Sequence, residues 1–534
     1  MTEQYGDYQI RKDFLLPVRI LESRQIENQE ELFREKAKAV SFRNDNCAHM
    51  KGKGAYLLLD FGRELCGGLR IITRLTPTTT RLRLTFGESV AEACSTIKEK
   101  NAGNDHSPRN LEVLLSGMSD LEFGLTGFRF ARVELLDDCE VLLCNIYAFC
   151  KLPVLAQEAS IVTNDPLLNR IIETAAYTLK LNFQNGFIWD GIKRDRLVWC
   201  GDLHPEILTS LYCFGKTVNV TNSLDFLREN TPQGEWVNTI PTYSAWWVAN
   251  LCDYVNLTGD RDYFEKHADH AEAIFAQFDA LIDPDGTMHF DDGKCGMPYY
   301  LDWPSFQTPD AVIGTASLLV WTAKKYLTMK DCPAARRIRD KLQCYLEKPA
   351  AFKQIRAFQI MAGGSTEGGK AFLEDGCAKG MSTFMAYYIL TGTAMAGSKE
   401  PLNMLKQYYG GMLSRGATSF WEDFDIDWLE GSGRIDELPQ PGQTDIHGDY
   451  GKYCYKQFRH SLCHGWSSGV LAFIIEHIVG LQVRDGYREV AVIPHSLGLT
   501  DVDAVFPTPY GPLSIHTHNR QTTVEVPDGI TLVS

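Results

Sequence analysis

The polar and apolar positions follow two different periods along the chain, and the period changes twice. Up to about residue 155, short runs alternate with period two, as in residues 81–88 and 128–135, and a third apolar run covers residues 55–62. Alternation of this kind predicts half-buried β-strands. Clusters of turn residues separate the runs, so residues 1–155 are predicted to form an antiparallel β-sandwich.

From residue 156 to about 478 the apolar positions recur with the helical period. The first helix is expected to begin at Pro166, because Asp165 can cap it and proline suits the first helical position. Many antiparallel helices with long loops at one end suggest a helical barrel with its site among those loops. Further amphipathic segments cover residues 206–214, 221–229, 243–257, 262–282, 310–329, 334–346, 377–391, 401–412 and 464–479.

The tail, residues 479–534, returns to alternation. Residues 487–494 alternate, and residues 511–518 and 522–527 follow as further short runs. These segments predict a small C-terminal β domain packed against the helices. Three domains, 1–155, 156–478 and 479–534, suit a chain too long for one small core.

The charge, the apolar runs and the cysteine pattern of the chain argue against several classes of partner. The net charge of −15, without a basic run, argues against nucleic acid or an anionic membrane as the main partner. We find no secretory signal at the start and no apolar run of about 18 residues that could span a bilayer. Fifteen cysteines without a Cys-x-x-Cys spacing favour free thiols in a reducing cytosol, and they argue against a structural zinc site. A cytoplasmic protein is expected.

Residues 189–202 contain the most informative chemistry, with three carboxylates, three cations and two tryptophans. If a helix starts at Asp195, then Asp195, Trp199, Asp202 and Glu206 share one face. Acids and indoles on one stripe suit a sugar site, because carboxylates bind hydroxyls or transfer protons and indoles cover the apolar face of a ring. The alternative is a buried ion-pair network in which Arg194 and its neighbours neutralise the acids. This stretch alone leaves both interpretations open.

Two later clusters add candidates. Glu422 follows Trp421 where a helical segment gives way to a long loop, and His464 stands near the start of the last predicted helix. Alone, Glu422 is more often a solvated loop carboxylate and His464 a hydrogen-bonded core residue. Trp247 and Trp303 are likewise more often packing residues than ligand platforms. There is no Gly-x-Ser-x-Gly elbow, no phosphate-binding loop and no His-Glu-x-x-His motif to support another chemistry.

Taken together, these motifs resemble the α-L-rhamnosidases of glycoside hydrolase family 78. The resemblance rests on Asp190-x4-Asp195-x6-Asp202 early in the helical region and on Ala417-Thr418-x-x-Trp421-Glu422 late in it. It implies an (α/α)6 barrel flanked by N-terminal and C-terminal antiparallel β-sandwich domains. It also implies an inverting exo-glycosidase that acts on terminal α-L-rhamnose, without a cofactor or metal. A homodimer is compatible with this assignment.

The resemblance also assigns roles to single residues. It implies that Asp195 is the general acid and Glu422 the general base, about 6.5–9.5 Å apart so that a water fits between them. The substrate-binding residues that it implies are Asp190, Arg194, Trp199, Asp202, Trp247, Trp303 and His464.

The chain departs from the family pattern in the first motif. Gly191-Ile192 replaces the usual Cys-Pro, Asp195 stands where Glu is common, and the segment before Trp199 is one residue shorter than in some members. These changes allow a different substrate, such as another deoxysugar or a uronic acid, or a member that binds sugar without cleaving it. The leaving group and linkage are not determined by the sequence.

Overall fold

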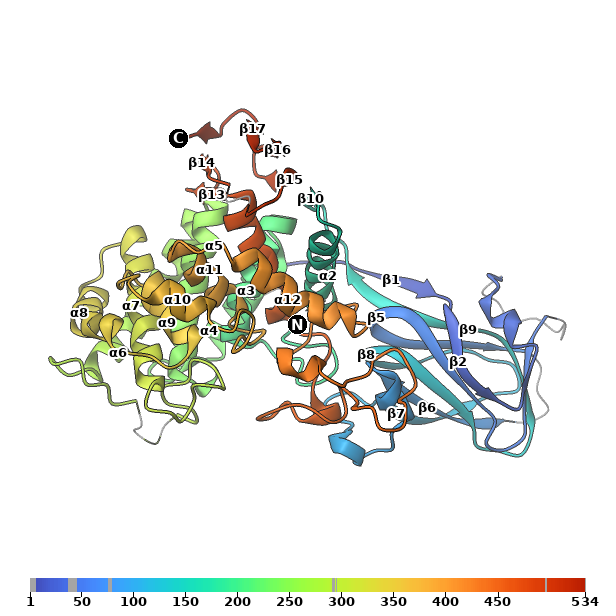
Figure 1. Cartoon of the computed structure of the whole chain (residues 1–534). Coiled ribbons are helices and arrows are strands. Elements are labelled where there is room, and N and C mark those ends of the chain that lie inside the picture. The colour runs from blue at the N-terminus through green and yellow to red at the C-terminus, as the bar shows by residue number, and fades with distance from the viewer. Residues whose placement is uncertain are drawn as a thin grey trace.

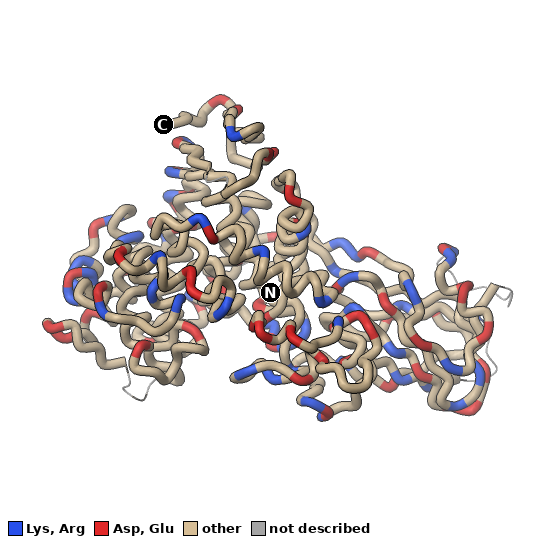
Figure 2. The backbone as a smooth tube through the Cα atoms, viewed as in Figure 1, with Lys and Arg blue, Asp and Glu red and all other residues tan. Residues whose placement is uncertain are grey.

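The protein consists of a β region, a helical region and a smaller C-terminal β region, in the predicted order. The computed structural model describes residues 6–36, 46–74, 79–290, 293, 295–494 and 497–533. Figure 1 shows the N-terminal strands at one end of an elongated molecule, the helices at the other end, and the C-terminal strands above the helices. Acidic and basic positions are interspersed in all three regions (Figure 2).

Nine strands in the described part of the N-terminal region form one hydrogen-bonded sheet. The longest strand, β5, pairs with β2 along its first half and with β9 along its second half, while β8 accompanies it throughout. Their inward side chains form a separate apolar core. The strands are β1 (Ile10–Leu15), β2 (Arg19–Arg24), β3 (Ile26–Glu27), β4 (Ala48–Lys51), β5 (Tyr56–Thr73), β6 (Thr80–Gly87), β7 (Asn110–Leu115), β8 (Asp120–Leu135) and β9 (Glu140–Pro153).

The helical region begins with α2 at Pro166, as predicted. The carboxylate of Asp165 accepts hydrogen bonds from the amides of Leu167 and Leu168, which satisfies two of the free N–H groups at the helix start. The helices are α2 (Pro166–Asn182), α3 (Cys200–Phe214), α4 (Val218–Glu229), α5 (Pro241–Thr258), α6 (Arg261–Ala280), α7 (Ala311–Met329), α8 (Pro333–Leu342), α9 (Lys353–Met361), α10 (Gly369–Glu374), α11 (Ala386–Met395), α12 (Pro401–Ser414) and α13 (Gly469–Phe473).

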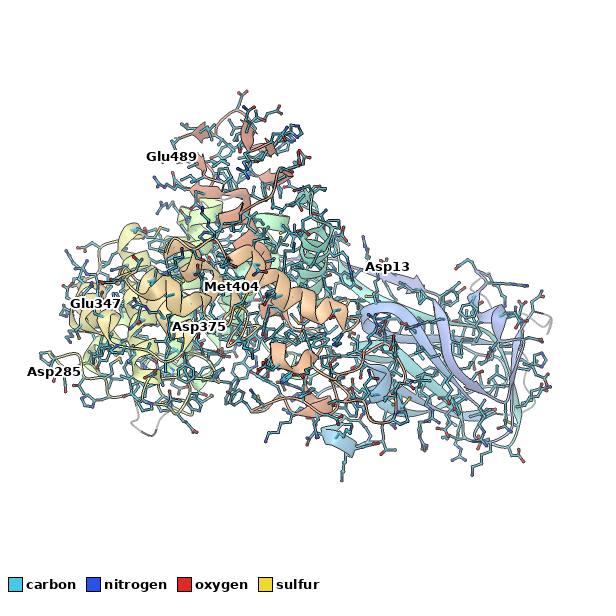
Figure 3. All side chains as sticks on the ribbon, viewed as in Figure 1. Asp13, Asp285, Glu347, Asp375, Met404 and Glu489 are labelled. Atoms are coloured by element: carbon cyan, nitrogen blue, oxygen red, sulfur yellow. The ribbon has the colours of Figure 1, made fainter. Side chains whose placement is uncertain are left out.

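Helix α9 was not predicted from the sequence. Its buried face includes Lys353, Gln354 and Gln359 among the apolar side chains, so the apolar period is interrupted. Gln359 is satisfied by the carbonyls of Tyr345 and Lys348, which explains how an amide can occupy the core. Figure 3 shows side chains filling the helical region, where Met404 is fully buried and Asp285, in the loop after α6, is exposed.

The C-terminal region contains two small sheets, and its apolar side chains join the core of the helical region. One sheet combines β13 (Leu481–Arg484), β14 (Glu489–Val492) and β18 (Thr531–Leu532). The other combines β15 (Asp501–Thr508), β16 (Gly511–His518) and β17 (Gln521–Glu525) with β10 (Ser160–Thr163), which precedes α2. The predicted packing of the tail against the helices is confirmed. Within the described residues, no helix is both long and apolar enough to cross a membrane.

Candidate active site

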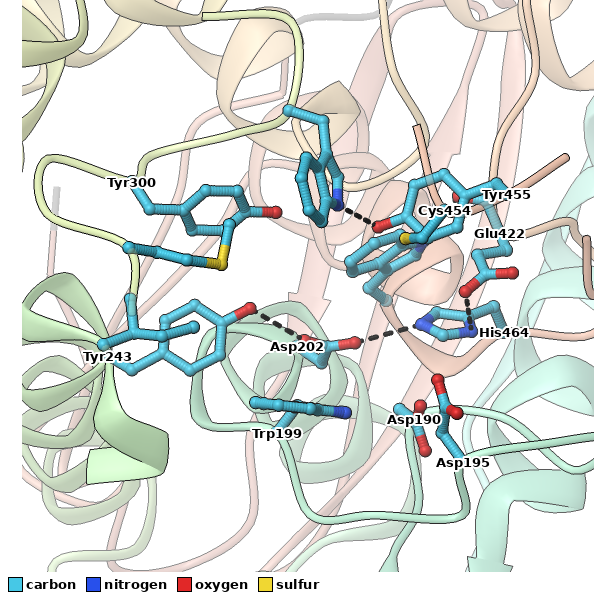
Figure 4. Close-up of a pocket in the computed structure, with 14 residues that line it drawn as sticks. Asp190, Asp195, Trp199, Asp202, Tyr243, Tyr300, Glu422, Cys454, Tyr455 and His464 are labelled. Carbon is cyan, nitrogen blue, oxygen red and sulfur yellow. Dashed lines mark hydrogen bonds and ion pairs between the residues drawn. The ribbon is translucent and has the colours of Figure 1, made fainter. Parts of the chain in front are cut away.

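One cavity brings together most of the residues that the sequence singled out (Figure 4). Its volume is about 480 Å³ including the open mouth. Seven of the nine predicted site residues line it, while Arg194 and Trp247 do not. The lining consists of Asp190, Asp195, Trp199, Asp202, Ile240, Tyr243, Met297, Tyr300, Trp303, Glu422, Cys454, Tyr455, His464 and Trp466.

The loop that holds the first motif is not helical. Helix α3 begins at Cys200, and Asp195 and Arg196 both adopt positive φ angles of 56°. The expectation of a helix from Asp195 is therefore wrong, and Asp195 does not share a helix face with Asp202. The loop closes on itself instead, because the Asp190 side chain accepts a 2.8 Å hydrogen bond from the amide of Leu197. This geometry turns Asp195 toward the mouth, where 23% of its side chain is exposed.

Two distant segments meet beside this loop. Gly191 and His464 form an isolated antiparallel bridge, and the amide of Gly465 donates a 2.7 Å hydrogen bond to the carbonyl of Asp190. A Cβ atom at Gly465 would lie 1.9 Å from Oε1 of Glu206, so a side chain there would force the buried Glu206 carboxyl to move. Segments more than 260 positions apart are thus fixed against each other at the cavity floor.

Asp202 and His464 form a buried pair. Nε2 of His464 lies 3.0 Å from Oδ2 of Asp202, and the Tyr243 hydroxyl reaches the other carboxylate oxygen at 3.5 Å. Burial lowers the pKa of His464, but the charges of Glu422 and Asp202 outweigh it and the net pKa is raised. The imidazolium form is therefore favoured between two carboxylates.

Glu422 is held as a carboxylate. Although burial raises its pKa, Arg194 and His464 outweigh that effect, and the net pKa lies below its usual value. Nη2 of Arg194 contacts both carboxylate oxygens, the amide of Ser461 donates to Oε2 at 3.0 Å, and Nδ1 of His464 lies 3.7 Å from Oε1. A buried carboxylate with this set of donors can accept a proton from a bound water.

The two other carboxyls near the mouth differ in environment. Asp195 is bonded by Nη1 of Arg194, with His106 at 3.6 Å and Arg459 at 3.9 Å from its Oδ1. Asp190 is buried, and burial raises its pKa well above the usual value despite the opposing charge of His464. Asp195 thus faces cations and solvent, whereas Asp190 is in a position that favours the protonated form.

Aromatic rings form much of the rest of the cavity wall. Trp199 packs edge-to-face with Tyr243 at a centroid distance of 6.0 Å, and the indole N–H of Trp303 donates to the Tyr455 hydroxyl at 2.5 Å. Tyr300, Tyr455 and Trp466 also line the cavity and were not identified from the sequence. The sequence around these three residues does not indicate a binding role, because an isolated aromatic residue is as common in packing as in binding.

Trp247 lies outside the cavity. Its side chain is fully buried one turn further along α5 than Tyr243, its indole N–H donates to the carbonyl of Leu224 at 3.1 Å, and it packs edge-on against His270. Tyr243, at the loop end of the same helix, occupies the cavity wall instead. The sequence stretch was informative, but it did not indicate which ring faces the cavity.

Part of the chain is similar to a known family of proteins. Residues 156–290 match a family model described as the bacterial α-L-rhamnosidase six-hairpin glycosidase domain. Among curated proteins, no sequence matches this chain.

Several solved structures share the fold. A family 78 rhamnosidase of Bacillus sp. GL1 has a TM-score of 0.68 at 18% identity, over 90% of this chain and 52% of that one. A rhamnosidase from Klebsiella oxytoca with rhamnose bound has a TM-score of 0.67 at 18% identity, over 88% and 96%. A Streptomyces avermitilis α-L-rhamnosidase complexed with L-rhamnose has a TM-score of 0.69 at 16% identity, over 98% and 50%.

The chain therefore spans about half the length of two of these three proteins and nearly all of the third. The matches confirm the predicted resemblance to glycoside hydrolase family 78: residues 156–290 match a glycosidase domain, and the solved rhamnosidases share the fold. They also confirm the coarse architecture, a helical domain accompanied by β domains.

Proposed function

We propose that this protein is an inverting exo-glycosidase that removes terminal α-L-rhamnose from oligosaccharides or glycosides. The observation that carries the proposal is a single cavity in which four carboxyls face an aromatic wall, in a chain whose segment 156–290 matches a rhamnosidase domain. Carboxyls can bind sugar hydroxyls and transfer protons, while rings cover the apolar face of the sugar.

In this proposal Glu422 is the general base. It takes a proton from a water while the water oxygen bonds to the anomeric carbon, and the bond to the leaving oxygen breaks on the opposite face. The lowered pKa of Glu422 suits this role, because a base must be ionised before it acts. Asp202 and His464 would bind hydroxyls of the sugar ring beside it.

Asp195 is proposed as the general acid that protonates the leaving oxygen. It is the carboxyl at the open mouth, where the leaving group must depart, and one guanidinium, that of Arg194, contacts both Asp195 and Glu422. The guanidinium of Arg194 therefore lies between the two carboxyls.

Asp190 is the competing candidate for the acid. Its burial raises its pKa, which keeps a proton available, whereas Asp195 is partly exposed and pairs with Arg194. The geometry of Arg194 supports a second function, a member that binds rhamnose without hydrolysing it, because one guanidinium engages both carboxyls that hydrolysis would need.

The finer architecture belongs to the same proposal. We assign residues 156–478 to an (α/α)6 barrel and residues 1–155 and 479–534 to β-sandwich domains, as the resemblance implies. A cytoplasmic location is part of the same proposal, and the absence of a repeated cysteine spacing supports it. The substrate proposed as partner is a rhamnose-containing glycoside.

The test is hydrolysis of 4-nitrophenyl glycosides, with the rhamnoside compared with other deoxysugars and uronic acids, and with NMR of the first anomer released. We expect cleavage of the rhamnoside with release of the β-anomer, loss of most activity in Asp195→Asn, and a smaller loss in Asp190→Asn. If the order of the two variants is reversed, Asp190 is the acid. If rhamnose raises the melting temperature but no product forms, the protein is a binding member.

A further inference from the structure

We propose that Glu88, from the N-terminal β region, and Lys193 are positioning residues for the base Glu422. They fix the segment 460–462, whose backbone in turn binds the Glu422 carboxylate. This inference rests on the proposed function for its catalytic consequence, but the contacts that define it are independent of the substrate.

The starting point is a buried cluster of charges outside the cavity. Glu88 and Glu92 lie between β6 and the end of α1 (Val90–Cys94), and each is only 1% exposed. Nζ of Lys193 lies 2.8 Å from Oε1 of Glu92 and 3.3 Å from Oε2 of Glu88. Two buried carboxyls require a partner, and the ammonium of Lys193 provides it.

Local structure fixes the direction of Glu88. The Ser89 hydroxyl caps α1 by accepting a 3.1 Å hydrogen bond from the amide of Glu92, and the Glu92 carboxylate accepts a 2.8 Å bond from the amide of Glu88. This reciprocal arrangement resembles a capping box and holds the start of α1 rigidly. The Glu88 side chain is therefore presented to the loop below it in one orientation.

Glu88 and Glu422 bind the same short segment. Oε2 of Glu88 accepts a 2.6 Å hydrogen bond from the amide of Leu462, and Oε1 accepts a 3.2 Å bond from the Ser461 hydroxyl. The amide of Ser461 donates to Glu422 at 3.0 Å, and the amide of Glu422 donates to the Ser461 carbonyl at 2.9 Å. Any shift of Ser461 relative to Glu88 is thus transmitted to the base.

Lys193 connects the same segment to the first motif. Its ammonium donates to the carbonyl of His460 at 2.8 Å, and the next residue, Arg194, contacts Glu422 directly. The lysine therefore ties together three parts of the chain: the β6–α1 connection, the loop of residues 189–199 and the segment 460–462. A positioning role follows because a displacement of about 1 Å at a catalytic group can cost ~100-fold in rate.

The cluster is filled by an ammonium rather than by a metal ion. Glu88, Glu92 and His447 have potential ligand atoms within 4.8 Å of one another, a spacing that three metal ligands could adopt. Both nitrogens of His447 are engaged, however: Nδ1 pairs with the Ser89 hydroxyl at 2.8 Å, and Nε2 with the His460 carbonyl at 2.9 Å. Lys193 also occupies the position of a cation between the two carboxylates.

The test compares Glu88→Gln with Glu112→Gln on strand β7, whose partly exposed side chain pairs with Arg83. Glutamine keeps the size of Glu88 but replaces one carboxylate oxygen by an amide, so it cannot form the ion pair with Lys193 and accept from both Leu462 and Ser461. Burial raises the pKa of Glu88 to about 7, so the kcat values of the variants are compared above that pH. In Glu88→Gln we expect kcat for the rhamnoside to fall by about 10–100-fold with KM little changed. The acidic limb of the pH profile should move to higher pH, because a loosened Ser461 amide no longer lowers the pKa of Glu422. Glu112→Gln should resemble the unaltered protein.

Hydrogen exchange separates this inference from the proposed function. Amides of residues 460–464 should exchange faster in Glu88→Gln than in Glu112→Gln, whether or not the protein cleaves rhamnosides. Unchanged exchange, or unchanged kcat and pH profile in an active enzyme, overturns the inference. A protein without activity but with the faster exchange overturns only the function.

Variants of Ser461 and Lys193 distinguish a positioning effect from a folding defect. Ser461→Ala removes one bond to Glu88 without removing a buried charge, and it should shift kcat and the acidic limb in the same direction by a smaller amount. Lys193→Arg keeps the cation and should retain most activity, whereas Lys193→Met should not. If a chelator removes activity and a divalent metal restores it, the cluster of Glu88, Glu92 and His447 binds a metal ion, and the role given to the Lys193 ammonium is wrong.

Discussion

The two walls of the cavity are built in different ways. The aromatic wall comes from helix ends and the loop before α7, with Trp199 at the start of α3, Tyr243 in the first turn of α5, and Trp303 in that loop. Apart from Asp202 in the first turn of α3, the charged residues come from irregular loops. These loops contact one another over more than 200 positions of sequence, as Arg194 and Glu422 do. If the proposed function holds, the ring contacts determine sugar affinity, whereas the positions of the charges determine the chemistry.

The largest effect is expected from Glu422→Gln. If Glu422 is the base, kcat should fall by about 10²–10⁴-fold, since general base catalysis is typically worth that much. Glu430→Gln, an exposed change in the same loop, is the matched control. Steady-state kinetics with the nitrophenyl rhamnoside measures both. A Glu422→Gln enzyme with more than half the original kcat would remove Glu422 from the mechanism.

A smaller effect, with a distinct pH signature, is expected from Arg194→Met. Arg194 helps to lower the pKa of Glu422, so the acidic limb of kcat/KM should lie below the usual glutamate value and move to higher pH in the variant. The pH dependence of stability has the same sign. Because the pKa of Glu422 is lower in the folded than in the unfolded protein, ionised Glu422 stabilises the fold above the unfolded-state pKa. This contribution is lost as the pH falls through the folded-state pKa.

The measurement is the pH profile of kcat/KM for Arg194→Met beside that of Arg170→Met, an exposed arginine on α2. Arg170→Met should keep the original limb. An acidic limb that stays in place when Arg194 is removed would mean that His464 and the Ser461 amide alone hold the Glu422 charge.

The smallest effect should separate the two tryptophans. Trp303→Ala should raise KM by roughly two- to tenfold, because an aromatic contact is worth about 0.5–1.5 kcal/mol. Trp247→Phe should leave KM unchanged and lower the thermal unfolding midpoint, since it removes the buried bond to Leu224. Titration with L-rhamnose and thermal unfolding measure these outcomes. An equal rise of KM in both variants would contradict the placement of Trp303 in the cavity wall and Trp247 in the core.

Much of the architecture could be predicted from the sequence, because local signals determine it. The change of hydrophobic period placed the β and helical regions in the right order, and Asp165-Pro166 located the start of α2. Helix α9 was missed because buried glutamines interrupt its apolar face. The strand β10 was also hidden, since it pairs with β15 more than 330 positions later.

The sequence by itself determined which kinds of residue are available: the acids of the first motif, Glu422 after Trp421, and His464. Only the tertiary structure decided how they are used. Asp195 leaves the helix face that its spacing suggested because the Asp190–Leu197 bond closes the loop, and Tyr243 rather than Trp247 faces the cavity. The charge of a carboxyl depends on which cations, amides and apolar groups surround it, and these come from distant segments such as the one that carries Glu88. Spacing along the chain does not contain that information.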